Sequence, residues 1–192
     1  MSTTDLEELL RNKKRAEGPT INWEGRKTVW LGKIEELFRD IKDWLASLCQ
    51  DGLLTIEEDT DNLNERHIGP YLVPTLRITN RAGEEVRLSP VATQIVAGYG
   101  RIDMQGPNWR KLTIVLSSSD RPAAFHTRVF VGDGSDVKKV TSTDHDIPKL
   151  LSIVEIMDKH CRWYFVDPSD GSHKRLVTQK SFEDALIGMF EP

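Results

Sequence analysis

The sequence predicts an α+β protein in which a long N-terminal helix packs on a strongly twisted antiparallel sheet, one that could close toward a barrel, with a short C-terminal helix after it. Three observations predict this class. Large apolar residues recur every three or four positions between Trp30 and Leu48, which is the spacing of one face of an α-helix. After Gly52, most apolar residues lie in short runs or alternations separated by turn residues, as is typical of antiparallel strands. A final apolar run, Phe182 to Phe190, follows Ser181, a residue type that commonly caps helices.

Length and composition divide the chain into an arm and a domain. The 192 residues suffice for one domain with a core of its own. The start of the chain is mostly polar, and a helix between Asp5 and Arg15 would be marginal alone, although three leucines fall on one side of it: Leu6, Leu9 and Leu10. We therefore expect residues 1–19 to form a flexible charged arm that orders on contact with something else, and residues 20–192 to form a single α+β domain.

The long helix is expected to begin at Asn22, whose side chain can cap the first free amides, and to end at Asp51-Gly52, where glycine can take the left-handed closing conformation. The apolar stripe of this helix has to be buried against another surface. The stripe can pack on the protein's own sheet, or a partner helix can share it in a short coiled-coil seam. We expect it to pack on the protein's own sheet.

The next elements are a strand from Leu53 to Glu58 and an acidic loop over 59–69. A hairpin then joins 71–79 to 84–88 through Arg81-Ala82-Gly83, with Gly83 in the left-handed position of a three-residue loop. This register pairs the apolar residues of the two strands and places Arg77 opposite Arg87 on the other face.

The rest of the chain is expected to be mainly β. We predict strands or apolar runs at 94–105, 109–116, 126–131 and 150–156, the last of undetermined type, and a second hairpin joining 161–166 to 173–178. Gly98 and Gly100 lie inside one of these strands, where glycine usually marks a bulge, a bend or a close approach by another group.

The pairing of Arg77 with Arg87 suggests a binding site, because like charges directly opposite on a sheet repel each other. A carboxylate from the acidic loop or a bound anion could offset the repulsion, or the two side chains could splay into water. Arg101 and Trp109 could extend this basic and aromatic face, which is one way to bind single-stranded nucleic acid. The candidate anion- or ligand-binding residues are therefore Arg77, Arg87, Arg101 and Trp109.

The acidic segment suggests a different surface. Six acidic residues and one arginine lie between Asp51 and Pro70, and such a cluster can steer a basic partner electrostatically. The candidate partner-binding residues are Glu57, Glu58, Asp59 and Asp61. The net charge of −4 argues against a general affinity for nucleic acid, so another protein is the expected partner and nucleic acid is the less favoured one.

No motif in the sequence assigns a catalytic residue, a cofactor or a metal site. Asp144-His145-Asp146 reads as a solvated turn, and Asp158, His160 and Cys161 lack further zinc ligands at matching spacing. The two cysteines are expected to be small buried residues rather than a redox pair. We find no signal peptide and no apolar segment long enough to span a bilayer, so we expect a cytoplasmic protein without a membrane partner.

Several stretches resemble a group of small uncharacterised bacterial proteins with a long N-terminal helix followed by an antiparallel sheet. They are Trp23-Glu24, Trp30, Trp44, the run from Gly100 to Pro107 and the run from Ser181 to Leu186. The resemblance implies a bacterial α+β protein and no particular activity, cofactor or catalytic residue.

Together these observations favour a non-enzymatic protein-interaction module, such as an accessory or immunity-type subunit of a bacterial cytoplasmic system. One alternative is an anion or single-stranded nucleic-acid binder that uses the basic sheet face. A second is a hydrolase whose site is assembled from separate loops, using Asp103, Asp144 and His145.

Overall fold

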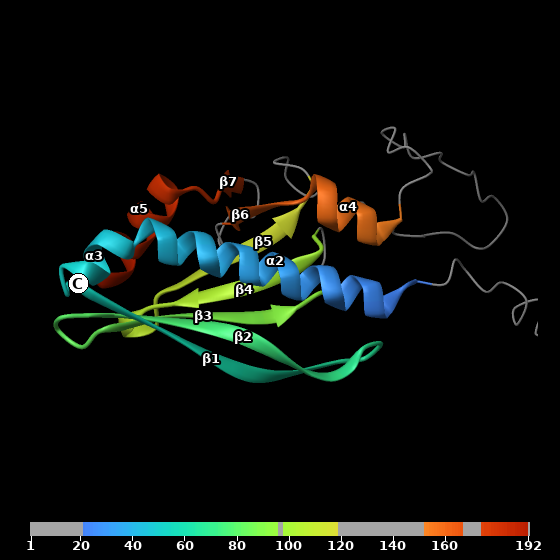
Figure 1. Ribbon diagram of the computed structural model, residues 1–192, viewed down its shortest axis with the longest axis horizontal. Coiled ribbons are helices and arrows are strands. Elements are labelled where there is room, and N and C mark those ends of the chain that lie inside the picture. The colour runs from blue at the N-terminus through green and yellow to red at the C-terminus, as the bar shows by residue number, and fades with distance from the viewer. Residues whose placement is uncertain (1–20, 96–97, 119–151, 167–173, 192) are drawn as a thin grey trace, which may run out of the picture.

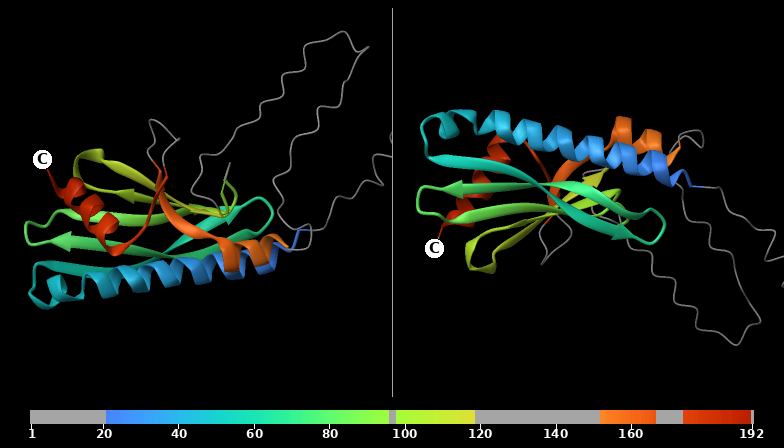
Figure 2. Two further views of the ribbon diagram at one scale, coloured as in Figure 1. Left: turned by 90° about the horizontal axis from the view of Figure 1, so that it is seen from above. Right: turned by 60° about the horizontal axis from the view of Figure 1, so that its bottom comes forward.

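The computed structural model describes residues 21–95, 98–118, 152–166 and 174–191 (Figure 1). In chain order these form α2 (Trp23–Trp44), α3 (Ala46–Gln50), β1 (Leu54–Glu65), β2 (Gly69–Asn80), β3 (Glu85–Ala92), β4 (Gly100–Gln105), the 3₁₀ turn η1 (Pro107–Trp109), β5 (Lys111–Ser117), α4 (Ile153–His160), β6 (Arg162–Val166), β7 (Lys174–Leu176) and α5 (Gln179–Phe190). The described strands make one antiparallel sheet in which each pairs with the next along the chain, from β1 at one edge to β7 at the other. The α+β prediction is confirmed, and the sheet is twisted and open rather than a closed barrel (Figure 2).

The N-terminal helix begins where the sequence predicts, because the Asn22 side chain accepts a hydrogen bond of 2.8 Å from the Gly25 amide. Its far end differs in one detail. The predicted single helix is divided at Leu45, which is fully buried, into α2 and the five-residue α3. Gly52 then closes the segment with a φ of 64°, the left-handed conformation expected there.

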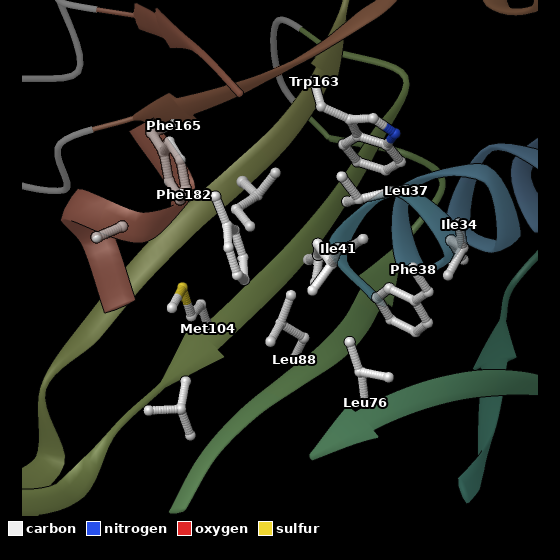
Figure 3. Close-up of a cluster of buried hydrophobic side chains, with 14 of the residues drawn as sticks. Ile34, Leu37, Phe38, Ile41, Leu76, Leu88, Met104, Trp163, Phe165 and Phe182 are labelled. Atoms are coloured by element: carbon white, nitrogen blue, oxygen red, sulfur yellow. The ribbon is translucent and has the colours of Figure 1, made fainter. Parts of the chain in front are cut away.

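The stripe of α2 packs on the protein's own sheet and is not left for a partner helix. Trp30, Ile34 and Ile41 are fully buried, and Leu37 and Phe38 are nearly so. They lie over the apolar face of the sheet (Figure 3), whose residues are also fully buried: Leu76, Ile78, Val86, Leu88, Ile102, Met104 and Ile114. Burial of each such side chain stabilises the fold by about 1.5–3 kcal/mol, so this contact between helix and sheet contributes substantially to stability.

The predicted hairpin register is confirmed. Ile78 pairs with Val86 and Leu76 pairs with Leu88, so Arg77 does lie opposite Arg87. Gly83 has the predicted positive φ, 80°.

The predicted acidic loop over 59–69 is wrong. β1 continues to Glu65 and pairs along its whole length with β2. The residues have low β propensity, but β2 supplies a complete ladder of backbone partners, and charged side chains are well tolerated on an edge strand. The acidic residues therefore stand on a strand at the edge of the sheet.

Three smaller predictions need adjustment. The run 150–156 of undetermined type leads into α4, which Ser152 caps in a reciprocal arrangement with Glu155. The C-terminal helix starts earlier than predicted, because Thr178 is its cap and Ser181 is the third helical residue of the capping box. The strand predicted from Trp109 begins at Lys111, after η1.

The arm over 1–19, the strand predicted at 126–131 and Asp144-His145-Asp146 lie outside the described residues.

A buried polar cluster fastens the tip of the β1–β2 hairpin to α2 and to the end of β3. The Glu65 carboxylate accepts hydrogen bonds from the amide (3.0 Å) and hydroxyl (2.9 Å) of Thr93 and from the hydroxyl of Tyr71. Arg26, which is 6% exposed, donates to the Thr93 carbonyl. Burial lowers the pKa of Arg26, while burial and the bond to Glu65 raise the pKa of Tyr71. The cluster explains how a polar hairpin tip is held firmly against the helix.

Candidate functional site

The two arginines of the predicted anion site are neutralised by carboxylates. Arg77 lies between Glu57 of β1 and Glu85 of β3, with N–O distances of 3.3 and 3.4 Å. Arg87 pairs with Asp61 at 2.8 Å. The repulsion between Arg77 and Arg87 is therefore relieved by carboxylates, one of the explanations that the sequence left open. These carboxylates come mainly from the acidic strand β1 and not from a loop.

Arg101 lies on the same face of the sheet as Arg87 but in a separate cluster. Its guanidinium forms a fork on Asp103, with distances of 2.7 and 3.2 Å, and Lys111 binds the same carboxylate at 2.7 Å. Asp103 is thus occupied by two cations, and its side chain is only 14% exposed. This arrangement leaves the carboxylate little freedom to act as the catalytic group of the hydrolase alternative.

Trp109 stands apart from the three arginines. It ends the 3₁₀ turn between β4 and β5, has a φ of 63°, and is 88% exposed. Arg101 lies near the opposite end of β4, so the structure does not gather the four predicted residues into one site.

The predicted partner-binding residues divide among three environments. Glu57 and Asp61 form the arginine pairs just described, whereas Glu58 forms an ion pair with Lys42 of α2. Asp59 accepts a hydrogen bond from the Thr60 amide and forms no ion pair with any other described residue. β1 therefore presents less unpaired negative charge than its sequence suggests.

A polar hollow of about 360 Å³ lies between β1 and the arginines, lined by Glu57, Glu58, Asp59, Thr75, Arg77 and Arg87. It contains more carboxylates than cations. An anion entering it would have to displace Glu57 or Asp61 from an arginine, which weakens binding. The hollow is better explained as an ion-pair network that holds β1 on the sheet.

An apolar groove of about 700 Å³ lies at the other end of β1. We define it as the α3–α5 groove, because its lining residues come from the end of α2, from α3, from the start of β1 and from α5. These elements meet at one end of the molecule (Figure 1). Its residues are Trp44, Leu45, Ser47, Leu48, Leu53, Leu54, Gln179, Glu183, Leu186, Ile187, Phe190 and Glu191. An exposed apolar hollow of this size is typical of a binding site.

The groove combines rigid walls with exposed apolar contact points. Trp44 is fixed against Phe182 of α5, with ring centroids 5.9 Å apart, and Leu45 and Leu186 belong to the buried core. Ile187 and Leu53 are 58% and 40% exposed. Among the described residues of the lining, the charged side chains are Glu183 and Glu191, so the groove favours an apolar ligand that carries positive rather than negative charge.

The sequence predictions missed this groove. It is assembled from segments far apart in the chain, and no local motif marks it. One signal was available, since α5 has more apolar residues than a single buried stripe needs: Ile187 and Phe190 stand beside the stripe formed by Phe182, Ala185, Leu186 and Met189.

The described residues give no support for redox or metal chemistry. They contain no group of three or more His, Cys, Asp or Glu side chains placed to hold a metal ion, and Cys49 and Cys161 are both free thiols. Cys161 is buried, and burial raises its pKa to about 11, so its reactive thiolate form is scarce at neutral pH. Asp144 and His145 of the hydrolase alternative lie outside the described residues.

Among the helices in the described chain, none is both long and apolar enough to cross a bilayer. A scan against protein-family models, a search of curated proteins and a search of solved structures each found no match.

Proposed function

We propose that this protein is a protein-interaction module that binds, in the α3–α5 groove, a partner segment with an apolar face and flanking basic residues. The observation that carries the proposal is the groove itself: a hollow of about 700 Å³ with exposed apolar walls and only acidic charges in its lining. An accessory or immunity-type subunit of a bacterial cytoplasmic system is the narrower form of this proposal.

The shape of the groove supports a helical or extended peptide as the occupant. Most of its lining comes from helices, namely the end of α2 with α3 and, from far along the chain, α5. The lining also includes the buried core residues Leu45 and Leu186. An amphipathic helix commonly binds in such a groove by inserting its apolar side chains between two helices. Ile187 and Leu53, which are partly in water in this structure, would be covered by the partner.

The charges of the protein support a basic partner. Glu183 and Glu191 lie in the lining, and Asp40 and Asp43 lie nearby on the exposed side of α2, where neither forms an ion pair with another described residue. These carboxylates would steer a basic segment toward the groove and disfavour an acidic one. The predicted anion site on the sheet is a weaker candidate, because each of its arginines already binds a carboxylate.

The proposal can be tested by site-specific photo-crosslinking in cells. The crosslinking residue p-benzoylphenylalanine replaces Ile187 in the groove or, as a matched control, Leu72, which is 64% exposed near the other end of the molecule. We expect one protein to crosslink at position 187 and not at position 72, and to bind again when both proteins are purified. If position 187 yields no specific crosslink, or if positions 187 and 72 yield the same products, the groove is not the interaction surface.

A further inference from the structure

We propose that the free edge of β1 is a second interaction surface, which binds an extended peptide segment in which apolar residues alternate with basic ones. The segment adds a strand to the sheet beside residues 54–58. This surface is separate from the α3–α5 groove, so the inference goes beyond the proposed function and does not depend on it.

The outer edge of β1 carries backbone groups that no described strand uses. β1 pairs with β2 alone, and the register between them is unbroken (Figure 1). The Asn80 amide of β2 donates to the Glu84 carbonyl on the side of β3, at 3.0 Å. Because these groups alternate along an antiparallel strand, the even-numbered residues of β2 bond toward β3 and the odd-numbered ones toward β1. Even-numbered residues of β1 pair with even-numbered residues of β2, so the amides and carbonyls of Leu54, Ile56 and Glu58 point outward.

Thr60 marks the end of the open stretch. Its amide also points outward, and the carboxylate of the neighbouring Asp59 accepts a hydrogen bond of 2.7 Å from it. This bond agrees with the direction assigned above, because the alternation leaves the Thr60 amide without a carbonyl of β2. Asp59 thus occupies the edge after Glu58, and residues 54–58 are left for a ligand.

A hollow of about 430 Å³ borders this stretch. Its lining is mainly small or apolar: Lys42, Ala46, Cys49, Leu54, Thr55 and Ile56. Leu54 and Ile56 pack against the core, and a ligand residue directly opposite Ile56 lies on the same face of the sheet. The ligand therefore needs an apolar residue at every second position. Peptides that extend a sheet bind in this way, with affinity from backbone hydrogen bonds and specificity from pockets for alternate side chains.

The other face of the same edge selects basic residues. The intervening positions of the ligand lie opposite Thr55 and Glu57 and next to Asp59. Glu57 is shared with Arg77 and its side chain is 62% exposed, whereas Asp59 is exposed and forms no ion pair with another described residue. Cations opposite this row are favoured and anions are repelled. A second copy of β1 would bring Glu57, Glu58 and Asp59 of both chains to one seam, so the same charges disfavour a homodimer through this edge.

A fluorescent peptide in which four arginines alternate with three valines tests the inference at physiological salt. The valines lie opposite residues 54, 56 and 58, so their amides are the donors to β1. One control peptide has the same residues in two blocks, and a second has N-methylated valines, which removes these donors and keeps every side chain. We expect the alternating peptide to bind the full chain at least about tenfold more tightly than either control. Equal affinities, or no binding of the alternating peptide, would overturn the inference.

Two proline variants map the peptide on the edge. Glu58→Pro removes an outward amide within the open stretch, and Thr60→Pro, the matched control, removes one that Asp59 already binds. Neither amide is used by β2, and proline is tolerated at such edge positions. We expect Glu58→Pro to weaken peptide binding at least about tenfold and Thr60→Pro to leave it unchanged. Equal effects of the two prolines would overturn the inference.

Two further variants separate the backbone from the charges. Glu58→Gln loses the ion pair with Lys42 but keeps the amide, so it should still bind the peptide. Asp59→Lys keeps the outward amides of residues 54–58 and should weaken binding about threefold or more. Urea unfolding shows whether each variant is folded, and Asp59→Lys decides the matter if Glu58→Pro is not. Unchanged binding by Asp59→Lys would contradict the charge selection.

Ile187→Asp separates this edge from the α3–α5 groove, which shares Leu54 with the hollow and also favours apolar, basic ligands. We expect Ile187→Asp to bind the peptide as the wild type does. Loss of binding in this variant would place the peptide in the groove, which overturns the inference and supports the proposed function. Sedimentation of the wild type should show a monomer, and a dimer that Glu58→Pro dissociates would make a second copy the occupant and overturn the inference as well.

Discussion

Gly100 lies directly against the indole ring of Trp30: a Cβ atom built on Gly100 would be 2.0 Å from Cζ3 and 2.5 Å from Cε3 of that ring. The contact brings the fully buried tryptophan of α2 onto the backbone of β4. Of the three explanations that the sequence offers for glycine in this strand, close approach by another group is therefore the one found at this position.

Gly100→Ala should destabilise the protein by about 1–3 kcal/mol, because either the ring or the strand has to move. Gly32 offers a matched control, since it lies in α2 and a Cβ built there meets nothing within 4 Å. Gly32→Ala should stabilise by about 0.5–1 kcal/mol through the helix preference of alanine. Urea unfolding of the two variants measures both effects, and equal stabilities would contradict the packing of α2 on β4.

The carboxylate that compensates Arg87 can be tested by a double-mutant cycle of Asp61→Asn and Arg87→Gln. Both side chains are partly exposed, so the coupling energy should be about 0.2–1 kcal/mol at low salt and should shrink strongly in 1 M NaCl. The measurement is urea unfolding of the four proteins at both salt concentrations. A coupling energy of zero at low salt would show that Asp61 of β1 does not neutralise Arg87.

The hydrogen bond from Tyr71 to Glu65 should appear in the stability at alkaline pH. The pKa of Tyr71 is raised in the folded protein above its unfolded value of about 10, so this group contributes stability that is complete below pH 10 and is lost as the pH rises further. The wild type should therefore be more stable than Tyr71→Phe at pH 8. Above pH 10 the difference should fall by at most about 1.4 kcal/mol per pH unit.

Tyr164→Phe serves as the control for that experiment, because Tyr164 is half-buried in β6 and lies outside the Glu65 cluster. Free energies of unfolding at pH 8, 10 and 11 give the required differences. A difference between wild type and Tyr71→Phe that stays constant across this range would show that the folded state does not protect the phenol.

The two thiols should react at very different rates. Cys161 is 2% exposed and has a pKa raised to about 11, whereas Cys49 is half-buried near the end of α3. Brief treatment with iodoacetamide at pH 8 should label Cys49 and leave Cys161 unlabelled, as read by mass spectrometry of peptides. Comparable labelling of both residues would mean that the junction of α4 and β6, where Cys161 lies, opens more readily than its burial implies.

The parts of the fold that the sequence predicted are those fixed by local spacing. The stripe from Trp30 to Leu48 and the hairpin around Gly83 each contain their own periodicity and their own closing glycine, so short windows sufficed. The acidic half of β1 was missed because its strand character comes from pairing with β2, not from its own residues.

The candidate site was harder to predict for a related reason. The sequence did place Arg77 opposite Arg87, and the structure confirms that pairing, but it could not show that Glu57 and Asp61 reach across to neutralise them. The α3–α5 groove exists only when α3 and α5, from opposite ends of the chain, lie side by side. Surplus apolar residues such as Ile187 were its only trace in the sequence.

Binding of a partner in the α3–α5 groove can be measured by calorimetric titration with the purified partner captured at position 187. The titration compares the wild type with Ile187→Asp and Leu72→Asp, two substitutions of exposed apolar residues at distant places. We predict that Ile187→Asp weakens binding at least about tenfold, since it puts a charge into the apolar contact, and that Leu72→Asp leaves binding unchanged. Equal affinities of all three proteins would contradict binding in this groove.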